Sequence, residues 1–118
     1  MLGWPTWIGV VADDLETQRR FYRDALGFEE TGSGEGWVHF EFDGKLFEVI
    51  QRDPSPQYER KRVQLGFTVE DIHAVRRELI DRGVEPISEI EGGPPDGRNF
   101  WCYFRDAEGN VFEITQWV

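Results

Sequence analysis

Two glutamates occupy matching positions in two nearly identical segments. LFEVIQ at residues 46–51 carries Glu48, and VFEITQ at residues 111–116 carries Glu113. Both segments have the β-branched and aromatic residues of a strand, where each glutamate shares a face with apolar side chains. A carboxylate on a buried face takes up a proton, or is compensated by a metal ion, a cationic ligand, a hydrogen-bond partner or water. Each glutamate is therefore a candidate ligand-binding group or general base.

A histidine is predicted to lie across from Glu48. Residues 36–42 alternate in hydrophobicity, residues 45–51 form a returning strand, and the Asp-Gly pair between them is typical of a two-residue hairpin turn. The register set by such a turn places His39 directly opposite Glu48 on the same face. Two interpretations stay open: a catalytic or ligand-binding pair, and a structural pair that only satisfies both side chains.

Aromatic residues are expected beside these groups. Strand alternation places Trp7 on the face away from the first helix, and Trp37 on the face of His39. Either Trp101 and Tyr103 or their strand neighbours are expected to join Trp7 and Trp37 on that side, because the five-residue turn DAEGN leaves the parity open. Aromatic walls with carboxylates suit a planar or cationic organic ligand, although such rings equally fill a core.

The secondary-structure elements that position these residues are predicted to occur twice in the same order. Strands are predicted at residues 6–12, 28–32, 36–42, 45–51, 63–69, 84–90, 99–105 and 111–118. A helix after each first strand begins at an acidic pair and ends at a glycine, Gly27 or Gly83. The chain is thus predicted to be an α+β fold in which βαβββ occurs twice.

A single domain is predicted to hold both copies. Its 118 residues comprise module one at 5–51, a polar linker at 52–62 and module two at 63–118. The longer second copy places its extra residues in the turn-rich loop 91–97. Duplicated modules of this kind pair or close around a shared concavity.

Composition narrows the classes of partner. The net charge of −10 disfavours nucleic acid and anionic membranes, which need clustered Lys and Arg. Cys102 is the only cysteine, so neither an intrachain disulfide nor a thiolate zinc cluster is expected, and its place in an alternating strand indicates packing. The sequence shows no apolar run of membrane-spanning length and no signal-peptide pattern, so a cytoplasmic protein is expected.

Three stretches resemble the vicinal oxygen chelate superfamily, which includes glyoxalase I, bleomycin-resistance proteins, fosfomycin-resistance enzymes and extradiol dioxygenases. They are WIGVVADDLETQRRFYRDALGF at 7–28, VQLGFTVEDIHAV at 63–75 and GRNFWCYFRDAEGNVFEITQ at 97–116. FYRDALGF and RDAEGNVFEITQ are the most specific of these pieces. The resemblance implies two βαβββ modules, each curling a mixed sheet into half of a cup, in a protein that is commonly a homodimer.

The resemblance also implies where a metal ion would bind. Metal enzymes of the superfamily place ligands on the first and last strands of each module, which correspond to Trp7, Glu48, Gln64 and Glu113. Trp7 departs from the usual His or Gln, because indole offers only an N–H donor. The oxygen atoms of Glu48, Gln64 and Glu113 would hold a hard divalent cation weakly. The expected cofactor is therefore none, or a weakly bound divalent metal.

Together these observations predict a glyoxalase/bleomycin-resistance-like protein that binds a small organic ligand, cationic or aromatic, in an acidic aromatic cup, as drug-sequestering antibiotic-resistance proteins do. One alternative is a metal-dependent lyase, isomerase or dioxygenase using Glu48, Gln64 and Glu113. Another is a metal-free proton-transfer enzyme with Glu48 or Glu113 as general base.

Overall fold

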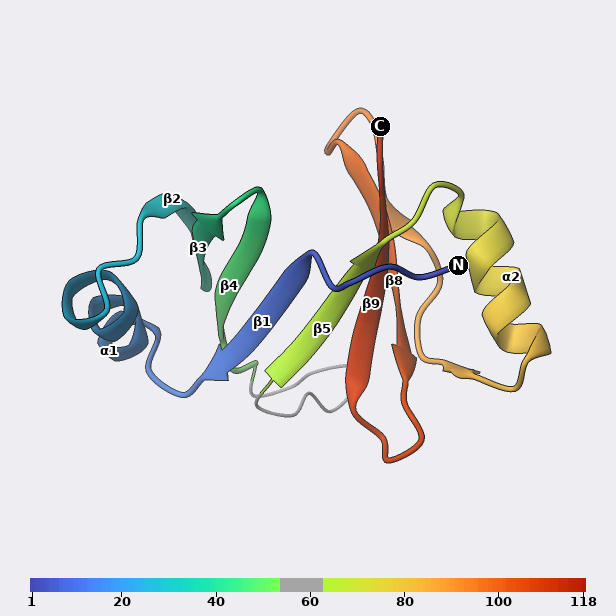
Figure 1. Ribbon diagram of the computed structural model, residues 1–118, viewed down its shortest axis with the longest axis horizontal. Helices are drawn as coiled ribbons and strands as arrows, with labels where there is room; N and C mark the ends of the chain where they lie inside the picture. The colour runs from blue at the N-terminus through green and yellow to red at the C-terminus, as the bar shows by residue number, and fades with distance from the viewer. Residues whose placement is uncertain (54–62) are drawn as a thin grey trace. The chain divides into compact units, whose positions relative to one another are not determined.

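The computed structural model describes residues 1–53 and 63–118, so most of the predicted linker lies outside the described residues. The chain divides into two compact units. The first unit is Thr6–Gln64, and the second unit is Leu65–Val118 together with Met1–Pro5. Each unit combines one helical segment with a mixed sheet (Figure 1), which confirms the predicted α+β class.

The first unit contains four strands in the order β2-β3-β4-β1. They are β1 (Trp7–Ala12), β2 (Glu30–Gly34), β3 (Trp37–Phe42) and β4 (Lys45–Gln51). β4 runs parallel to β1 and antiparallel to β3. Figure 1 shows the helix α1 (Leu15–Arg20) on one side of these strands.

The helix of the first unit begins where the acidic pair predicted. The Asp14 carboxylate accepts a hydrogen bond from the backbone N–H of Thr17 at 3.2 Å and caps α1. The helix then widens into the π-helical turn η1 (Phe21–Ala25). The strand predicted at 28–32 begins two residues later, at Glu30, because the Phe28 ring packs into the core instead of pairing in the sheet.

The core of the first unit lies between its helical segment and its sheet. Ala12, Val38, Phe40 and Val49 are buried, and Leu15, Tyr22, Phe28 and Phe47 pack against them. The buried residues of β3 and β4 alternate with His39 and Glu48 along their strands, so the histidine and the glutamate occupy the opposite face of the sheet.

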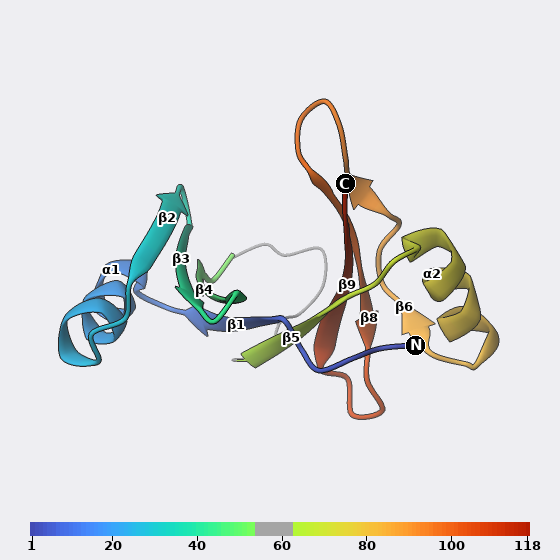
Figure 2. The same cartoon turned by 45° about the horizontal axis from the view of Figure 1, so that its top comes forward.

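The second unit has the sheet order β5-β9-β8-β6, with β7 also paired to β8. Its elements are β5 (Val63–Thr68, of which Leu65–Thr68 belong to this unit), α2 (Ile72–Asp81), β6 (Glu85–Pro86), β7 (Glu91–Gly92), β8 (Asn99–Arg105) and β9 (Val111–Trp117). In Figures 1 and 2, α2 lies on one side of β8 and β9. The Asp71 carboxylate accepts from the backbone N–H of Ala74 at 3.0 Å, and Gly83 follows the helix with φ of 87°.

The strand predicted at 84–90 forms only in part. Only Glu85–Pro86 pairs with β8, and a second short pairing forms at Glu91–Gly92. Between these pairings the Ser88 hydroxyl accepts the hydrogen bond from the Tyr103 N–H at 2.9 Å. A side chain thus replaces the backbone acceptor that a regular strand would present.

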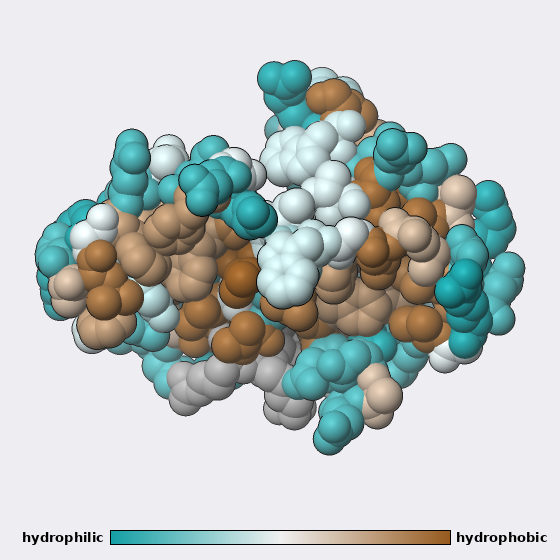
Figure 3. Space-filling model, in the orientation of Figure 1, coloured by the Kyte–Doolittle hydropathy of each residue, from teal (hydrophilic) through white to brown (hydrophobic). Residues whose placement is uncertain are grey.

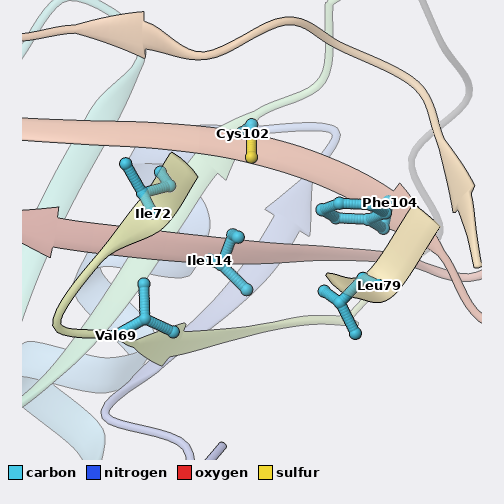
Figure 4. Close-up of a cluster of buried hydrophobic side chains, with 6 residues drawn as sticks. All are labelled: Val69, Ile72, Leu79, Cys102, Phe104 and Ile114. Atoms are coloured by element: carbon cyan, nitrogen blue, oxygen red, sulfur yellow. The ribbon is translucent and has the colours of Figure 1, made fainter. Parts of the chain in front are cut away.

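A second core fills the space between α2 and its sheet. Ile72 and Leu79 of α2 meet Cys102, Phe104 and Ile114 of the sheet, with Val69 beside them (Figure 4). Elsewhere the surface is mixed, and Figure 3 shows hydrophobic as well as hydrophilic side chains on the visible face. Among the described residues, no helix has both the length and the apolar character needed to cross a membrane.

Candidate functional site

The Asp-Gly turn sets the register that the sequence predicted. Asp43 and Gly44 have φ of 47° and 75°, which are the left-handed values that a tight hairpin turn needs. His39 pairs with Glu48 across β3 and β4. The His39 Nε2 contacts the Glu48 carboxylate directly through Oε2. The side chains are 27% and 18% exposed, so a ligand can reach the pair.

The histidine and the glutamate form the middle of a four-residue row. Gly9 of β1 pairs with Glu48, and Gly32 of β2 pairs with His39. Paired residues share a face, so the row crosses all four strands of the first unit on the side away from the core. Because glycine has no side chain, the space over each end of the row is open to side chains from neighbouring positions.

Two indoles occupy that space. A methyl group on Gly9 would lie 2.6 Å from Cη2 and 2.8 Å from Cζ2 of Trp7, so the outer edge of this indole covers Gly9. At the other end, the Trp37 ring centroid lies 4.4 Å from that of His39. The Trp37 indole also covers Gly34, the residue paired with it on β2. The His39–Glu48 pair is therefore flanked by aromatic rings at both ends of its row.

The rest of this face is mainly apolar near the pair. Leu46 and Ile50 are the neighbours of Glu48 on the same face of β4, as alternation predicts. Glu41 pairs with Leu46 and is exposed, so it adds a second carboxylate at the margin. We name this surface the aromatic–acidic face and define it by Trp7, Trp37, His39, Glu41, Leu46, Glu48 and Ile50.

The second unit repeats part of this arrangement. Gly66, Glu113 and Tyr103 form one row, and Thr68, Thr115 and Trp101 form the next. Cys102 and Phe104 lie in the core, so Trp101 and Tyr103 occupy the face of Glu113, which resolves the parity that the sequence left open. The Thr115 hydroxyl donates to the Glu113 carboxylate at 2.5 Å.

Two other candidates have clear surroundings. Gln64 lies on β5 two residues before Gly66 and is buried, at 1% exposure. Cys102 is fully buried, and burial raises the pKa of its thiol to about 11. A thiol with that pKa is protonated at neutral pH, so Cys102 is a packing residue and no reactive nucleophile.

On donor chemistry, the first unit does not fit a resident metal ion. Trp7 has no ligand atom, and the Glu48 carboxylate already contacts His39. No group of three or more His, Cys, Asp or Glu side chains within residues 1–53 and 63–118 is placed to hold one. The set of Glu48, Gln64 and Glu113 draws on both units and stays a prediction.

The sequence interpretation missed the glycines of the aromatic–acidic face. Gly9 and Gly34 are not ligand-binding groups, but they decide where two of the predicted aromatic residues lie. A signal was present, because glycine inside a strand pattern often marks a close approach of another group.

Comparison with known proteins places this geometry in context. The family model described as Glyoxalase/Bleomycin resistance protein/Dioxygenase superfamily matches residues 4–114. Virulence protein STM3117 of Salmonella typhimurium is 24% identical over 116 residues, which cover 92% of this chain and 81% of that protein. A glyoxalase/bleomycin resistance protein/dioxygenase superfamily member from Vibrio splendidus 12B01 has a TM-score of 0.74 at 16% identity, covering 98% of this chain and 99% of that chain. The Mn(II)-bound glyoxalase from Novosphingobium aromaticivorans has a TM-score of 0.73 at 18% identity, covering 95% of this chain and 38% of that chain.

Proposed function

The chain belongs to the glyoxalase/bleomycin resistance protein/dioxygenase superfamily, and from this premise we propose that it binds a small organic cation bearing an aromatic group. The aromatic–acidic face of the first unit is the recognition surface. Membership alone does not choose an activity, because one fold hosts many chemistries. The proposal therefore rests on one observation: the His39–Glu48 pair, flanked at the two ends of its row by the indoles of Trp7 and Trp37.

The chemistry of these groups selects the ligand. An indole face attracts a cation by about 0.5–2 kcal/mol, more as water is displaced. The Glu48 carboxylate adds a charge-assisted contact in the same place. An anionic ligand would meet Glu48, Glu41 and a chain of net charge −10. A neutral aromatic ligand would use the indoles but leave the carboxylate without a new partner.

His39 has a defined part in this binding. When the imidazole is neutral and protonated at Nε2, it donates to Glu48 Oε2 and holds the carboxylate in place. The carboxylate then keeps its negative charge for the ligand.

The test is a calorimetric titration with benzyltrimethylammonium. We expect binding to wild type, with affinity about 10- to 100-fold weaker in Glu48→Gln, because the Coulombic attraction between the carboxylate and the quaternary ammonium is lost. Glu29→Gln is the matched control, since it removes one exposed carboxylate from the same unit outside the face. Benzenesulfonate should not bind. Equal affinity of wild type and Glu48→Gln, or equal binding of benzenesulfonate, would refute the proposal.

A second candidate is metal-free proton transfer, favoured by the accessible His39–Glu48 contact. Glu48 would remove a proton from a carbon next to a carbonyl, and the electron pair would pass to the carbonyl oxygen. Exchange of that hydrogen in D2O, followed by NMR over a panel of small ketones and thioesters, tests this. Glu48→Gln should abolish the exchange while leaving binding intact, and retained exchange would end the assignment. Glu113→Gln tests the other candidate base in the same way.

The metal-dependent alternative has its own test. Protein purified without chelator would carry stoichiometric metal, and Glu113→Gln would lose it, if Glu48, Gln64 and Glu113 form a centre. That result would replace the binding proposal. Gln64, Trp101 and Tyr103 remain predicted ligand contacts, and drug sequestration and a cytoplasmic location remain proposals. A homodimer, which the superfamily resemblance suggests, is tested by light scattering.

A further inference from the structure

We propose that Gly9 and Gly34 are the specificity-determining residues of the aromatic–acidic face. They allow the indoles of Trp7 and Trp37 to close onto the sheet on either side of His39 and Glu48. This inference rests on the proposed function, because it assigns to the two glycines the selection of aryl-substituted cations over simple ammonium ions.

The backbone does not require glycine at either position. Neither residue has the left-handed φ found at Gly44 or Gly92. Glycine inside a strand costs about 0.5–1 kcal/mol relative to alanine. A packing requirement therefore explains why Gly9 and Gly34 have no side chain. The atoms that lie nearest to an added methyl group identify that requirement.

At Gly34 the requirement is one edge of an indole. A methyl group there would lie 2.6 Å from each of three consecutive ring atoms of Trp37, Nε1, Cε2 and Cζ2. A point in the ring plane cannot be that far from all three bonded atoms at once, so the methyl would lie above the plane. The Nε1–Cε2–Cζ2 edge of Trp37 thus lies obliquely against the Gly34 backbone, in the space that a side chain at residue 34 would occupy.

At Gly9 the requirement is the edge of the other indole. The methyl would lie 2.6 Å from Cη2 of Trp7, with the Ile50 Cδ1 next at 3.4 Å. Gly9 is the direct pair of Glu48. Because Gly9 has no Cβ, Trp7 can reach the end of the row that holds the carboxylate.

Gly32 shows that close approach is not shared by every glycine of this face. It lies on the same strand as Gly34 and pairs with His39. The atom nearest to a methyl group added at Gly32 would be Trp37 Cζ3 at 3.8 Å, which is an ordinary contact distance. Gly32→Ala is therefore a matched control on the same face. Gly92, beneath Trp101 of the second unit, is no such test, because its φ of 82° already requires glycine.

The indole, and not the strand, should move in the variants. Both tryptophans are only partly buried, so a side-chain rotation can relieve each clash. Gly9→Ala and Gly34→Ala are expected to fold, with a tryptophan displaced from beside the His39–Glu48 pair. The displaced ring no longer stacks on the aromatic part of a ligand, while Glu48 still attracts its charge.

The experiment compares two probes in wild type and five variants. Wild type should bind benzyltrimethylammonium more tightly than tetramethylammonium, by about tenfold for stacking on an aromatic ring. In Gly9→Ala and Gly34→Ala this ratio should fall to about 3 or below, and in Gly32→Ala it should keep the wild-type value. Trp7→Ala and Trp37→Ala should reproduce the loss. Thermal melting confirms that each variant is folded.

The outcomes separate the two proposals. If wild type binds neither cation, the proposed function fails and this inference fails with it. If wild type binds both, and Gly9→Ala and Gly34→Ala keep its ratio, the inference alone is overturned. If Gly9→Ala does not fold, the ratio of the two affinities measured in Trp7→Ala decides for that site, and Trp37→Ala decides in the same way for Gly34. An unchanged ratio in that tryptophan variant counts against the inference.

Discussion

The buried thiol of Cys102 makes a sharp prediction about stability at alkaline pH. Burial is the largest cause of its raised pKa, the negative charge of Glu113 adds to the rise, and Arg76 opposes it. The pKa moves from an ordinary value of 9.0 to about 11. In the unfolded chain the thiol ionises from about pH 9, whereas in the folded protein it keeps its proton until about pH 11. The unfolded state binds fewer protons in this interval, so stability is complete below pH 9 and falls as the pH rises through 11.

The magnitude follows from the same values. Each pKa unit corresponds to about 1.4 kcal/mol, so a rise from 9.0 to about 11 corresponds to a loss of about 3 kcal/mol. This loss of stability is measured by urea unfolding of wild type and Cys102→Val at intervals between pH 8 and pH 11. Other groups titrate in this range, but they titrate in both proteins, so their effect cancels in the difference.

We expect the free energy of unfolding of wild type to fall relative to Cys102→Val by about 2–3 kcal/mol over this range. A difference between the two proteins that stays constant from pH 8 to pH 11 would refute the reasoning. A thiol reagent gives an independent check, because Cys102 should react only in urea. Rapid modification of the native protein would show that the thiol is accessible.

Three further predictions concern the stability of the folded protein. Hydrogen bonds from Arg19 lower the pKa of Glu30, so wild type should lose thermal stability as the pH falls below about 4.5. Arg19→Met should flatten that part of the profile of melting temperature against pH, and an unchanged slope would contradict the ion pair. Gly44→Ala should cost about 1 kcal/mol in denaturant unfolding because φ is 75° there, whereas Gly32→Ala should cost less. Leu79→Ala should cost about 2–4 kcal/mol by opening a cavity in the second core, and a loss below 1 kcal/mol would mean that the core collapses around it.

Local features of the chain account for most of what the sequence predicted correctly. The Asp-Gly turn determines the His39–Glu48 register because a two-residue loop leaves no freedom in the pairing. Asp14 and Asp71 begin the two helices because a short acidic side chain can cap the N–H groups of the residues that directly follow it. The family resemblance also depended on contiguous stretches, and the family comparison confirms it.

The errors and open points arose where distant groups compete for the same backbone or space. Ser88 interrupts the predicted strand at 84–90 because its hydroxyl meets the Tyr103 N–H across the sheet. The strand at 28–32 is shifted because Phe28 is drawn into a core formed by Tyr22 and Phe40. No local pattern contains these preferences.

The sequence by itself determined that Glu48 would be paired with a histidine on the face away from the helix, since alternation and turn length depend only on neighbours along the chain. Only the tertiary structure decided what surrounds that pair. Whether Trp101 faces Glu113 depended on a five-residue turn, and whether Trp7 and Trp37 reach the ends of the row depended on the absence of two Cβ atoms. Contacts of this kind are settled by packing between strands, where a difference of one methyl group determines which side chain fills a space.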